Sequence, residues 1–393
     1  MLRNRILLML FILGSGILVG FRGGSVSYLL FYSSLILPVL ALMNVFLVYL
    51  KFCIYQSIES KVLIKEERVP YLFKLSNEDF ISYTKIQVNF MKDYADVENM
   101  DQATNYSLLP GEEIHKETKI CCHYRGEYKV GIDYVTVSDF LNLFQFTYAC
   151  NSTIEVKVLP RILHLSKLAI APRSEDIKKQ QYLIQSKQVI PDVEVRMYQP
   201  TDTPKMIHWK ATARQGQLLT RKYTDDPKSE LVLLIDLQRI NVKEKERMMI
   251  EDKIIEAALA IADYFVRNHT PVSVIFDSTG VEKIHIYSKD DLNQFYKFCS
   301  EVRFHSKLTG DALLALSMQE SDHKKYSMLL TGSVDEELCK ASYQYIAFEN
   351  ELNIILVGEK NQQEIIDHIP DRVNLYRIRN TQEVQDVLEV EGV

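Results

Sequence analysis

The chain has 393 residues, of which 47% are hydrophobic and 25% are charged, and its formal net charge is -6. This length and composition suffice for two folded soluble domains besides any membrane segment, and the charge excludes the basic surface typical of nucleic-acid binding. The six cysteines lack the density and the paired spacing of a disulfide scaffold, which predicts a reducing compartment.

Residues 1–52 are predicted to form a transmembrane helical hairpin. Residues 6–21 and 23–50 contain no charged side chain, and only Arg22 separates them. A helix needs about 20 apolar residues to cross the hydrocarbon layer, so the second run is ample and the first is slightly short. A cleaved signal peptide is the alternative, but no small-residue cleavage pattern ends the first run and a second apolar run follows it.

The basic residues around the two runs predict their orientation. Cytoplasmic flanks are enriched in lysine and arginine, so both chain ends are expected in the cytoplasm and Arg22 at the outer tip. The flanking cations are Arg3, Arg5, Lys51, Lys61, Lys65 and Arg68. Neither run contains an acidic or basic residue, so the hairpin is interpreted as an anchor and not as a transport path.

Residues 56–160 are predicted to form an antiparallel β-sandwich of immunoglobulin-like type. Partly alternating β-rich runs separated by polar turns support this prediction. The runs are residues 83–90, 116–124, 134–137 and 154–159. A spacer or docking module is the expected role.

One group of metal-ligating residue types lies within this domain, at His115, Cys121, Cys122 and His123. In a strand, Cys121 and His123 would share one face while Cys122 takes the other, and no second pair of ligands completes a zinc pattern. Ordinary strand residues are therefore the preferred interpretation.

Residues 161–230 are interpreted as a connector that carries a dense motif. Residues 162–190 are polar, and their charges are typical of a solvated surface. The motif that follows, residues 195–223, contains the only tryptophan, Trp209, next to His208 and Lys210. A helix is predicted over residues 204–215, because Asp202 or Thr203 can cap it, Pro204 suits its first turn and Gly216 can end it. A strand is predicted to follow.

Helical spacing divides the motif into two sides. Met206, Trp209 and Ala213 share one side, which is predicted to be buried, while Lys210 and Arg214 share the other and present cations. The remaining residues singled out here are Arg196, Tyr198, Pro200, Asp202, His208 and Arg221. They are interpreted as a structural junction or a docking surface.

The motif from Val195 to Leu218, V-R-x-Y-x-P-x-D-x-x-x-x-I-H-W-K-A-x-A-R-x-G-x-L, resembles the core signature of the bacterial family called domain of unknown function 58. Residues 125–131, 138–144 and 159–161 resemble that family's sequence upstream of the signature. The resemblance implies a membrane protein with a von Willebrand factor A-like domain, associated with MoxR-type AAA+ ATPases in the assembly or maturation of envelope or other complexes.

Residues 231–393 are predicted to form an α/β domain with a mostly parallel sheet. Apolar strand runs alternate with helical patterns, the longest helix spans residues 243–268, and residues 282–287 are expected to turn back at a sheet edge. The other strands are predicted at residues 231–237, 272–276, 327–330, 353–357 and 374–378. In the long helix, Lys253, Glu256 and Asp263 occupy polar positions beside an apolar stripe. The whole chain is thus an α+β multidomain protein.

The family resemblance also points to a candidate metal site, because it implies a von Willebrand factor A-like domain. Von Willebrand factor A domains often bind a divalent ion through an Asp-x-Ser-x-Ser loop, but here the loop reads Asp236-Leu237-Gln238-Arg239-Ile240. Only Asp236 remains as an oxygen ligand of the kind magnesium prefers. No metal or other cofactor is therefore predicted, and a remodelled ligand-binding site at Asp236 is the alternative.

No nucleotide-binding loop, serine-hydrolase elbow or zinc-protease motif is present, so no enzyme is predicted. A hydrolase with His208 as general base is a weaker alternative. The favoured interpretation is a two-pass protein of the bacterial membrane whose cytoplasmic domains bind protein partners. The expected contacts are the lipid bilayer and a MoxR-type AAA+ ATPase, without nucleic acid.

Overall fold

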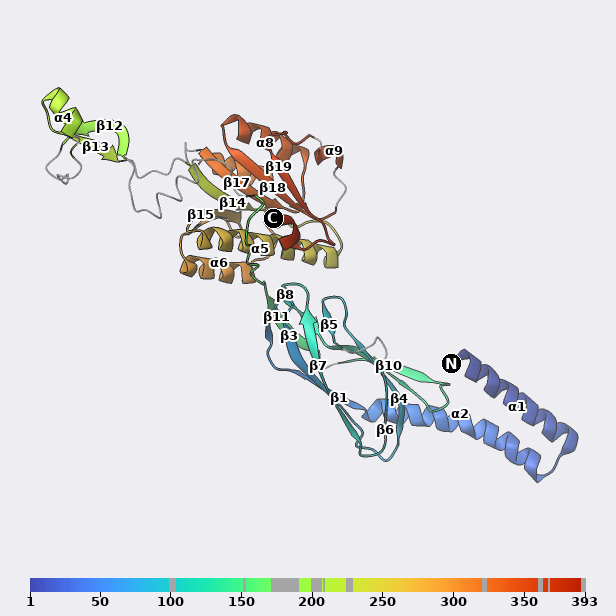
Figure 1. Ribbon diagram of the computed structural model, residues 1–393. Helices are drawn as coiled ribbons and strands as arrows, with labels where there is room; N and C mark the ends of the chain where they lie inside the picture. The colour runs from blue at the N-terminus through green and yellow to red at the C-terminus, as the bar shows by residue number, and fades with distance from the viewer. Residues whose placement is uncertain are drawn as a thin grey trace. The chain divides into compact units, whose positions relative to one another are not determined.

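The computed structural model describes residues 1–98, 104–150, 153–170, 191–198, 207, 209–223, 229–319, 324–359, 363–366 and 368–389. The chain divides into two compact units, Met1–Arg161 and Ile162–Val393. Figure 1 shows the elements of both units, and each unit is considered by itself.

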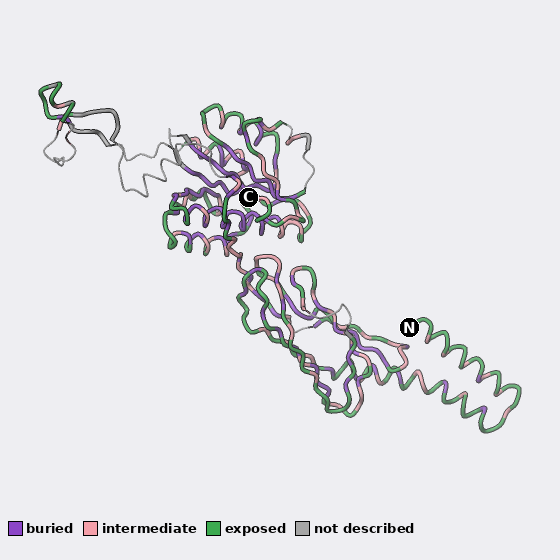
Figure 2. The backbone as a smooth tube through the Cα atoms, in the orientation of Figure 1, coloured by how far each residue is buried: buried purple, intermediate pink, exposed green. Residues whose placement is uncertain are grey.

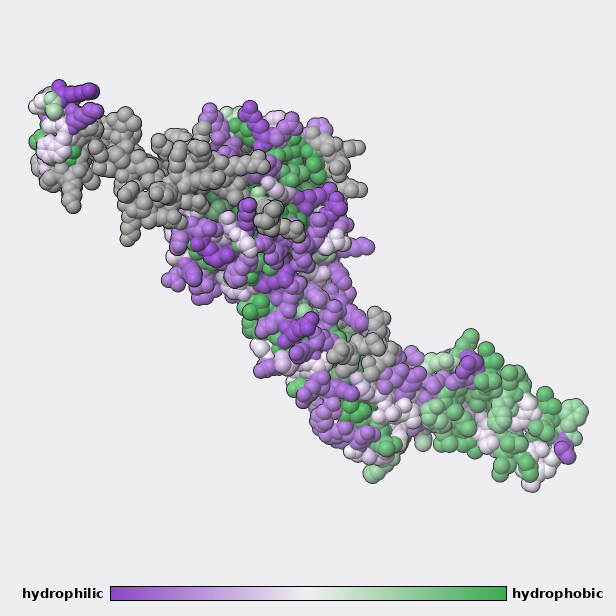
Figure 3. Space-filling view, in the orientation of Figure 1, coloured by the Kyte–Doolittle hydropathy of each residue, from purple (hydrophilic) through white to green (hydrophobic). Residues whose placement is uncertain are grey.

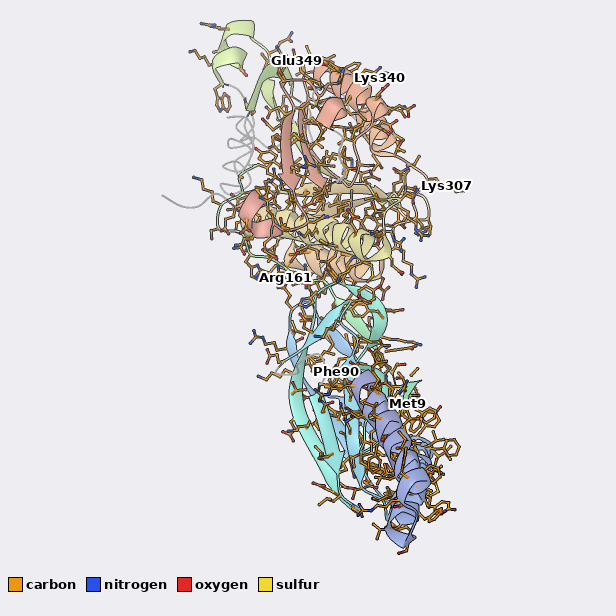
Figure 4. The ribbon with its side chains drawn as sticks, turned by 90° about the vertical axis from the view of Figure 1, so that its right-hand side faces the viewer. Met9, Phe90, Arg161, Lys307, Lys340 and Glu349 are labelled. Atoms are coloured by element: carbon orange, nitrogen blue, oxygen red, sulfur yellow. The ribbon has the colours of Figure 1, made fainter. Side chains whose placement is uncertain are left out.

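The first unit begins with the two expected apolar helices, α1 (Leu2–Arg22) and α2 (Ser25–Lys51). Both are long and apolar enough to cross a membrane. Gly23 and Gly24 form the turn between them with positive φ angles of 60° and 98°, a region that glycine enters at little cost. Figure 2 shows that most of both helices is exposed, and Met9 of α1, labelled in Figure 4, is 66% exposed.

Small residues allow the two helices to approach each other. The side chains of Ser15 and Ser34 are buried with their Oγ atoms 3.3 Å apart. Ser27, Ser34, Ala41 and Val48 are all buried on α2 at intervals of seven residues, a spacing that keeps one seam along one side of a helix.

The β part of the first unit contains three sheets. Their orders are β1-β3-β7-β5, β10-β9-β4-β6 and β2-β11-β8. The strands are β1 (Cys53–Ile58), β2 (Val62–Ile64), β3 (Arg68–Ser76), β4 (Tyr83–Phe90), β5 (Ala95–Val97), β6 (Thr104–Leu108), β7 (Glu113–Cys122), β8 (Gly126–Val130), β9 (Ile132–Ser138), β10 (Gln145–Ala149) and β11 (Ile154–Leu159). All pairs are antiparallel except β2 with β11.

The expected antiparallel strands are therefore present, and one core joins the two four-stranded sheets. The predicted start of this domain at residue 56 is too late. Strand β1 begins at Cys53, directly after α2, and the last turns of α2 contribute Val45, Val48 and Phe52 to the same core. Helix and sheet thus share buried apolar area, so α2 passes into the β part without a linker.

The second unit contains a six-stranded sheet of order β16-β15-β14-β17-β18-β19. The strands are β14 (Ser229–Ile235), β15 (Val272–Asp277), β16 (Val281–Ile286), β17 (Lys324–Thr331), β18 (Glu351–Val357) and β19 (Asn374–Ile378). Neighbouring strands are parallel except for the edge strand β16, which pairs antiparallel with β15 as its sequence predicted.

Helices cover both faces of this sheet. They are α5 (Glu244–Arg267), α6 (Lys289–Glu301), α7 (Gly310–Gln319), α8 (Glu336–Ala347), α9 (Gln363–Ile366) and α10 (Val384–Leu388). Alternate residues of β14 face opposite ways: Leu231, Leu233 and Ile235 join the core beneath α5 and α6, whereas Val232 and Leu234 join the core beneath α7 and α8. Figure 1 shows α5 and α8 on opposite sides of the sheet.

The predicted connector, residues 161–230, is corrected at its start. Leu165, Leu168 and Ile170 are at most 1% exposed and belong to the core beneath α5. Leu168 forms a bridge with Glu389, and the Tyr326 hydroxyl donates a hydrogen bond to the Ile170 carbonyl. Residues 162–170 are therefore part of the α/β core and not a solvated linker.

Candidate functional site

The sequence motif forms a small element of its own, which we call the signature hairpin. It consists of β12 (Pro191–Met197), the short helix α4 (Trp209–Gln215) and β13 (Leu219–Tyr223). The two strands are antiparallel, with Arg196 opposite Thr220 and Arg221 opposite Val195. The backbone N–H of Tyr198 continues the ladder by donating to the Leu218 carbonyl at 2.9 Å.

Helix α4 ends directly before Gly216, as the sequence predicted. Gly216 has a positive φ of 68°, and its N–H donates to the Thr212 carbonyl at 2.9 Å. The Thr212 hydroxyl accepts a hydrogen bond from the N–H of Leu219 at 3.1 Å, which ties the helix to β13. Thr212 is half-buried and Leu219 is buried, so this side of α4 faces the strands.

Two expectations about this helix are corrected. The predicted helix over residues 204–215 begins later, because Ile207 forms a single β-bridge and the helix starts at Trp209. The side with Trp209 and Ala213 is exposed, not buried, and the Trp209 side chain is 67% exposed. A helix of seven residues has room for one packed side, and Thr212 occupies it.

The exposed residues of α4 form two adjacent rows. Trp209 and Ala213 make one row, and Lys210 and Arg214 make the next, all with exposed side chains. Residues four apart lie one turn apart on the same side of a helix. An aromatic ring and two cations are thus presented together, and we call these four residues the α4 face. Pro200, Asp202 and His208 lie outside the described residues, so the structure does not test their predicted roles.

The second candidate region is the carboxyl edge of the large sheet, where Asp236 follows β14. Asp236 is 4% exposed. Its Oδ1 accepts a hydrogen bond from the N–H of Gln238 at 2.9 Å, and its Oδ2 accepts one from the hydroxyl of Thr331 at 2.8 Å. Burial raises the pKa of the Asp236 carboxyl above its usual range, although these two hydrogen bonds oppose the change.

The other loop positions of the expected metal motif have structural roles. Ile240 is buried in the core beneath α5 and lies against Gly332. A Cβ atom at Gly332 would overlap Cδ1 of Ile240 and lie 3.0 Å from Cγ2 of Ile250. An apolar contact therefore occupies the position where the expected motif has a second hydroxyl.

Asp311, at the start of α7, also approaches this edge, and sequence reasoning missed it. Its negative charge and that of Asp335 both raise the pKa of Asp236. The Oδ1 atom of Asp311 is buried, and no hydrogen-bond partner for it is present among the described residues. The one sequence signal was its position directly after Gly310 in the first turn of a helix.

These residues do not fit a divalent-metal site of the expected kind. Both Asp236 oxygens are engaged by protein donors, and Ile240 offers no ligand atom. Across the part of the chain that the structure describes, no three His, Cys, Asp or Glu side chains converge for a metal ion. The edge is a hydrogen-bonded structural junction around a buried carboxyl group.

The histidine and cysteine group of the β part follows the predicted alternation. Cys122 is buried in the core of the first unit, whereas Cys121 is half-buried and lies on the other face of β7. Burial raises the pKa of the Cys122 thiol to about 11, so the thiol is protonated at neutral pH. His123 lies 3.0 Å from Asp96, and His115 lies 3.3 Å from Glu113.

The fold is that of a protein with two apolar N-terminal helices, antiparallel sheets and an α/β unit. The family model described as "Protein of unknown function DUF58" matches residues 194–293, and this match supports the resemblance of the signature motif to that family. The matched region runs from the signature hairpin into α6 and includes both the α4 face and Asp236. No curated protein matches the sequence.

Solved structures with a similar arrangement have low sequence identity. Proximal thread matrix protein 1 from the mussel byssus is 14% identical, with a TM-score of 0.30 over 40% of this chain and 44% of that one. The pilus adhesin SpaC from Lactobacillus rhamnosus GG is 10% identical, with a TM-score of 0.29 over 40% of this chain and 29% of that one. This chain thus spans less than half of either protein, and TM-scores this low carry no argument about function.

Proposed function

We propose that this protein is a membrane-anchored adaptor that binds a protein partner through the α4 face. The observation that carries the proposal is the 67% exposure of Trp209, the only tryptophan, beside the exposed cations Lys210 and Arg214. Single exposed apolar side chains are ordinary on soluble domains. Here, however, the exposed ring lies within residues 194–293, the region that the family model matches.

The composition of the α4 face fits a protein partner. Tryptophan and arginine are the residue types most enriched among residues that dominate protein–protein binding, because each combines a large contact area with a directed polar group. Lys210 and Arg214 add two positive charges on adjacent turns, which favours an acidic surface on the partner.

The family resemblance supports a MoxR-type AAA+ ATPase as that partner, in the assembly or maturation of envelope or other complexes. The chain has no nucleotide-binding loop of its own. In this proposal the ATPase supplies the energy and the present protein supplies location and recognition, without catalysing a reaction itself.

We further propose that the α/β unit is a von Willebrand factor A-like domain that has lost its metal. Its parallel sheet with an antiparallel edge strand, and Asp236 at the end of β14, support the relationship. The contact between Ile240 and Gly332 replaces a ligand position with apolar packing. Recognition by this unit is therefore proposed to be independent of a divalent ion.

The location follows from the two apolar helices, which we propose to cross the membrane as a hairpin. Two cations near the helix ends, Arg5 in the first turns of α1 and Lys51 at the end of α2, support a cytoplasmic location of the two soluble parts by the positive-inside tendency. A cytoplasmic adaptor held at the membrane can meet a soluble ATPase there.

The test is purification of the intact protein from its own membranes in mild detergent, with mass spectrometry of bound proteins. Trp209→Ala and Arg214→Ala variants are compared with Phe348→Ala, which removes a ring that is 68% exposed on the α/β unit. We expect Trp209→Ala to reduce the recovered AAA+ ATPase by about tenfold, the effect of losing one dominant contact residue. Phe348→Ala is expected to retain it.

Folding of each variant is checked by its thermal midpoint. An ATPase that is recovered equally with Trp209→Ala and with the unmodified protein would contradict binding at the α4 face. Absence of any ATPase from the unmodified protein would contradict the partner itself.

A further inference from the structure

Three loops of the first unit lie together at one end of a sheet. In the sheet β10-β9-β4-β6, Tyr83 is opposite Leu108 and Lys85 is opposite Ser138. The loop before β4, the loop after β6 and the loop joining β9 to β10 therefore share this end. We call residues 77–82, 109–112 and 139–144 the loop cluster.

Each loop of this cluster exposes a large apolar side chain. Phe80 is 94% exposed, Leu109 is 65% exposed and Phe140 is 47% exposed. An isolated exposed apolar residue needs no explanation, but three at one end of a sheet indicate an interaction surface.

The backbone beneath these side chains is well ordered by hydrogen bonds. Asn77 is buried, and its side-chain amide donates to the carbonyl oxygens of Ile81 at 2.9 Å and Leu109 at 3.0 Å, joining two of the loops. The third loop is closed by the buried carboxylate of Asp139, which accepts from the backbone N–H groups of Leu141, Leu143 and Phe144. The apolar side chains are thus presented on a fixed support.

Side chains at the ends of the apolar helices hold the loop cluster. Residues at the start of α1 bind loop 139–144, which Figure 1 shows near the N-terminus, and the last residue of α2 binds loop 77–82. The contacts are Asn4 Nδ2 to the Leu141 carbonyl at 2.7 Å, Arg5 Nε to the Leu143 carbonyl at 2.8 Å, and Lys51 Nζ to Asp79 Oδ1 at 2.5 Å.

The sequence of the two helices gives the depth of these contacts. Arg5 directly precedes the uncharged run of residues 6–21, and Lys51 directly follows the uncharged run of residues 23–50. Charged side chains at the ends of a transmembrane helix lie at the edge of the hydrocarbon layer. When α1 and α2 cross the bilayer, the loops that Arg5 and Lys51 hold therefore lie at this edge.

The surface and charge of this region match a membrane interface. Figure 3 shows hydrophobic surface over both α1 and α2. The charged residues of the loop cluster itself are all acidic, namely Glu78, Asp79, Glu112 and Asp139, and the cation that pairs with Asp79 is Lys51 of α2. Acidic loops do not favour anionic lipids, so the apolar side chains carry the interaction.

We propose that the loop cluster is a membrane-binding surface, in which Phe80, Leu109 and Phe140 enter the interfacial layer of the leaflet that faces the soluble parts. This inference rests on the proposed anchoring of α1 and α2 in the bilayer. The contacts of Arg5 and Lys51 with the loops then orient the β part on the membrane, so that it does not swing freely below the helices.

The experiment uses the full chain reconstituted in phosphatidylcholine vesicles, with Trp209→Phe as background. Single tryptophans are introduced by Phe80→Trp or Phe140→Trp, and by Val62→Trp as a control in the exposed part of β2, beyond the far end of β1. Fluorescence quenching by a lipid with a nitroxide near its headgroup is compared with quenching by acrylamide. We expect the Phe80→Trp and Phe140→Trp variants to show about twofold or more lipid quenching relative to the control.

Lipid quenching that does not exceed the Val62→Trp control, together with full acrylamide quenching, would overturn the proposal. A Leu13→Trp variant in α1 tests the anchor separately with a nitroxide deep in the acyl chain. If Leu13→Trp is quenched while both loop variants behave like the control, the anchor stands and the membrane-binding surface is wrong. Quenching of the loop variants that requires anionic lipid would also overturn insertion by apolar side chains.

Discussion

Asp236 illustrates what a single buried carboxyl group contributes to this protein. Burial raises its pKa, hydrogen bonds from Gln238 and Thr331 lower it, and the charges of Asp335 and Asp311 raise it again. The net effect is a raised pKa, so the folded state holds a proton at pH values where the unfolded state has released it. A proton held only by the folded state makes stability decrease as pH rises.

The Asp236→Asn variant tests this effect because the amide does not titrate in this range. The wild-type protein is expected to lose stability as pH rises from about 4, the unfolded-state value, through the raised folded pKa, and then to level off. The variant lacks this loss. The thermal midpoint of the variant minus that of the wild type should therefore increase as the pH rises through this range. The exposed Asp371→Asn variant is the control, and parallel curves for Asp236→Asn and wild type would refute the assignment.

Gly332 is the other residue on which the sheet edge depends. Its missing Cβ makes room for Cδ1 of Ile240. Gly332→Ala is expected to destabilise the protein by about 1–3 kcal/mol through overpacking. Ile240→Val removes the overlapping methyl group, so the double variant should recover part of that loss, which urea unfolding of all four proteins measures. Strictly additive effects would show that the two side chains do not compete for the same space.

At the level of elements, α5 shows that a helical sequence pattern predicts the bounds of a helix better than it predicts which side chains are buried. The predicted helix over residues 243–268 is confirmed as Glu244–Arg267. The side chains at its predicted polar positions are nevertheless all buried, whereas an amphipathic helix would expose them to solvent. These residues are Lys253, Glu256 and Asp263. Asp263 accepts hydrogen bonds from Arg267 at 2.8 Å and lies 2.9 Å from His164 of the segment before the motif. That segment covers the side of the helix that the sequence assigned to solvent.

Lys253 joins this helix to the loop after β19. Its Nζ atom donates to the carbonyl oxygens of Arg379, Asn380 and Gln382 at 3.0, 2.8 and 2.6 Å. Three acceptors match the three donors of an ammonium group. Lys253→Met keeps the approximate length of the side chain but removes all three hydrogen bonds of the buried ammonium group, so we expect a loss of about 2 kcal/mol or more.

Urea unfolding measures this loss, and Lys245→Met on the exposed side of the same helix is the matched control, with an expected change within about 0.5 kcal/mol. Equal effects of the two substitutions would mean that the three hydrogen bonds contribute little to stability.

For the whole molecule, the contacts of the helix ends matter more than the length of the helices. Val45, Val48 and Phe52 of the α2 end belong to the β core, and Arg5 binds the loop between β9 and β10. In the proposed membrane hairpin, these contacts require both helix ends to lie on the same side of the membrane as the β part.

Labelling in intact cells checks the proposed cytoplasmic side. Ser25→Cys places a thiol at the exposed first residue of α2, next to the turn between the helices, while the native Cys53 is exposed just beyond the opposite end of α2. We expect a membrane-impermeant maleimide to label the Ser25→Cys variant in intact cells and the wild-type protein only after lysis. Labelling of the wild type in intact cells, with no increase for Ser25→Cys, would place the soluble parts outside.

The sequence by itself determined those features that depend on neighbouring residues. The apolar hairpin and the strands at residues 83–90, 154–159 and 374–378 were predictable, because hydrophobic content and side-chain alternation are local properties. The end of α4 at Gly216 was predictable for the same reason, since a left-handed residue ends a helix wherever it occurs. For the candidate site, the sequence identified the motif and the incomplete metal loop.

Only the tertiary structure decided which side chains of those elements are buried. Trp209 is exposed because Thr212 and Leu219 take the one packed side of α4. Ile240 fills the space left by Gly332, more than ninety positions later in the chain, and residues 162–170 cover α5. Burial depends on contacts between residues distant in sequence, which no local pattern contains, and burial decides both the raised pKa of Asp236 and the accessibility of the α4 face.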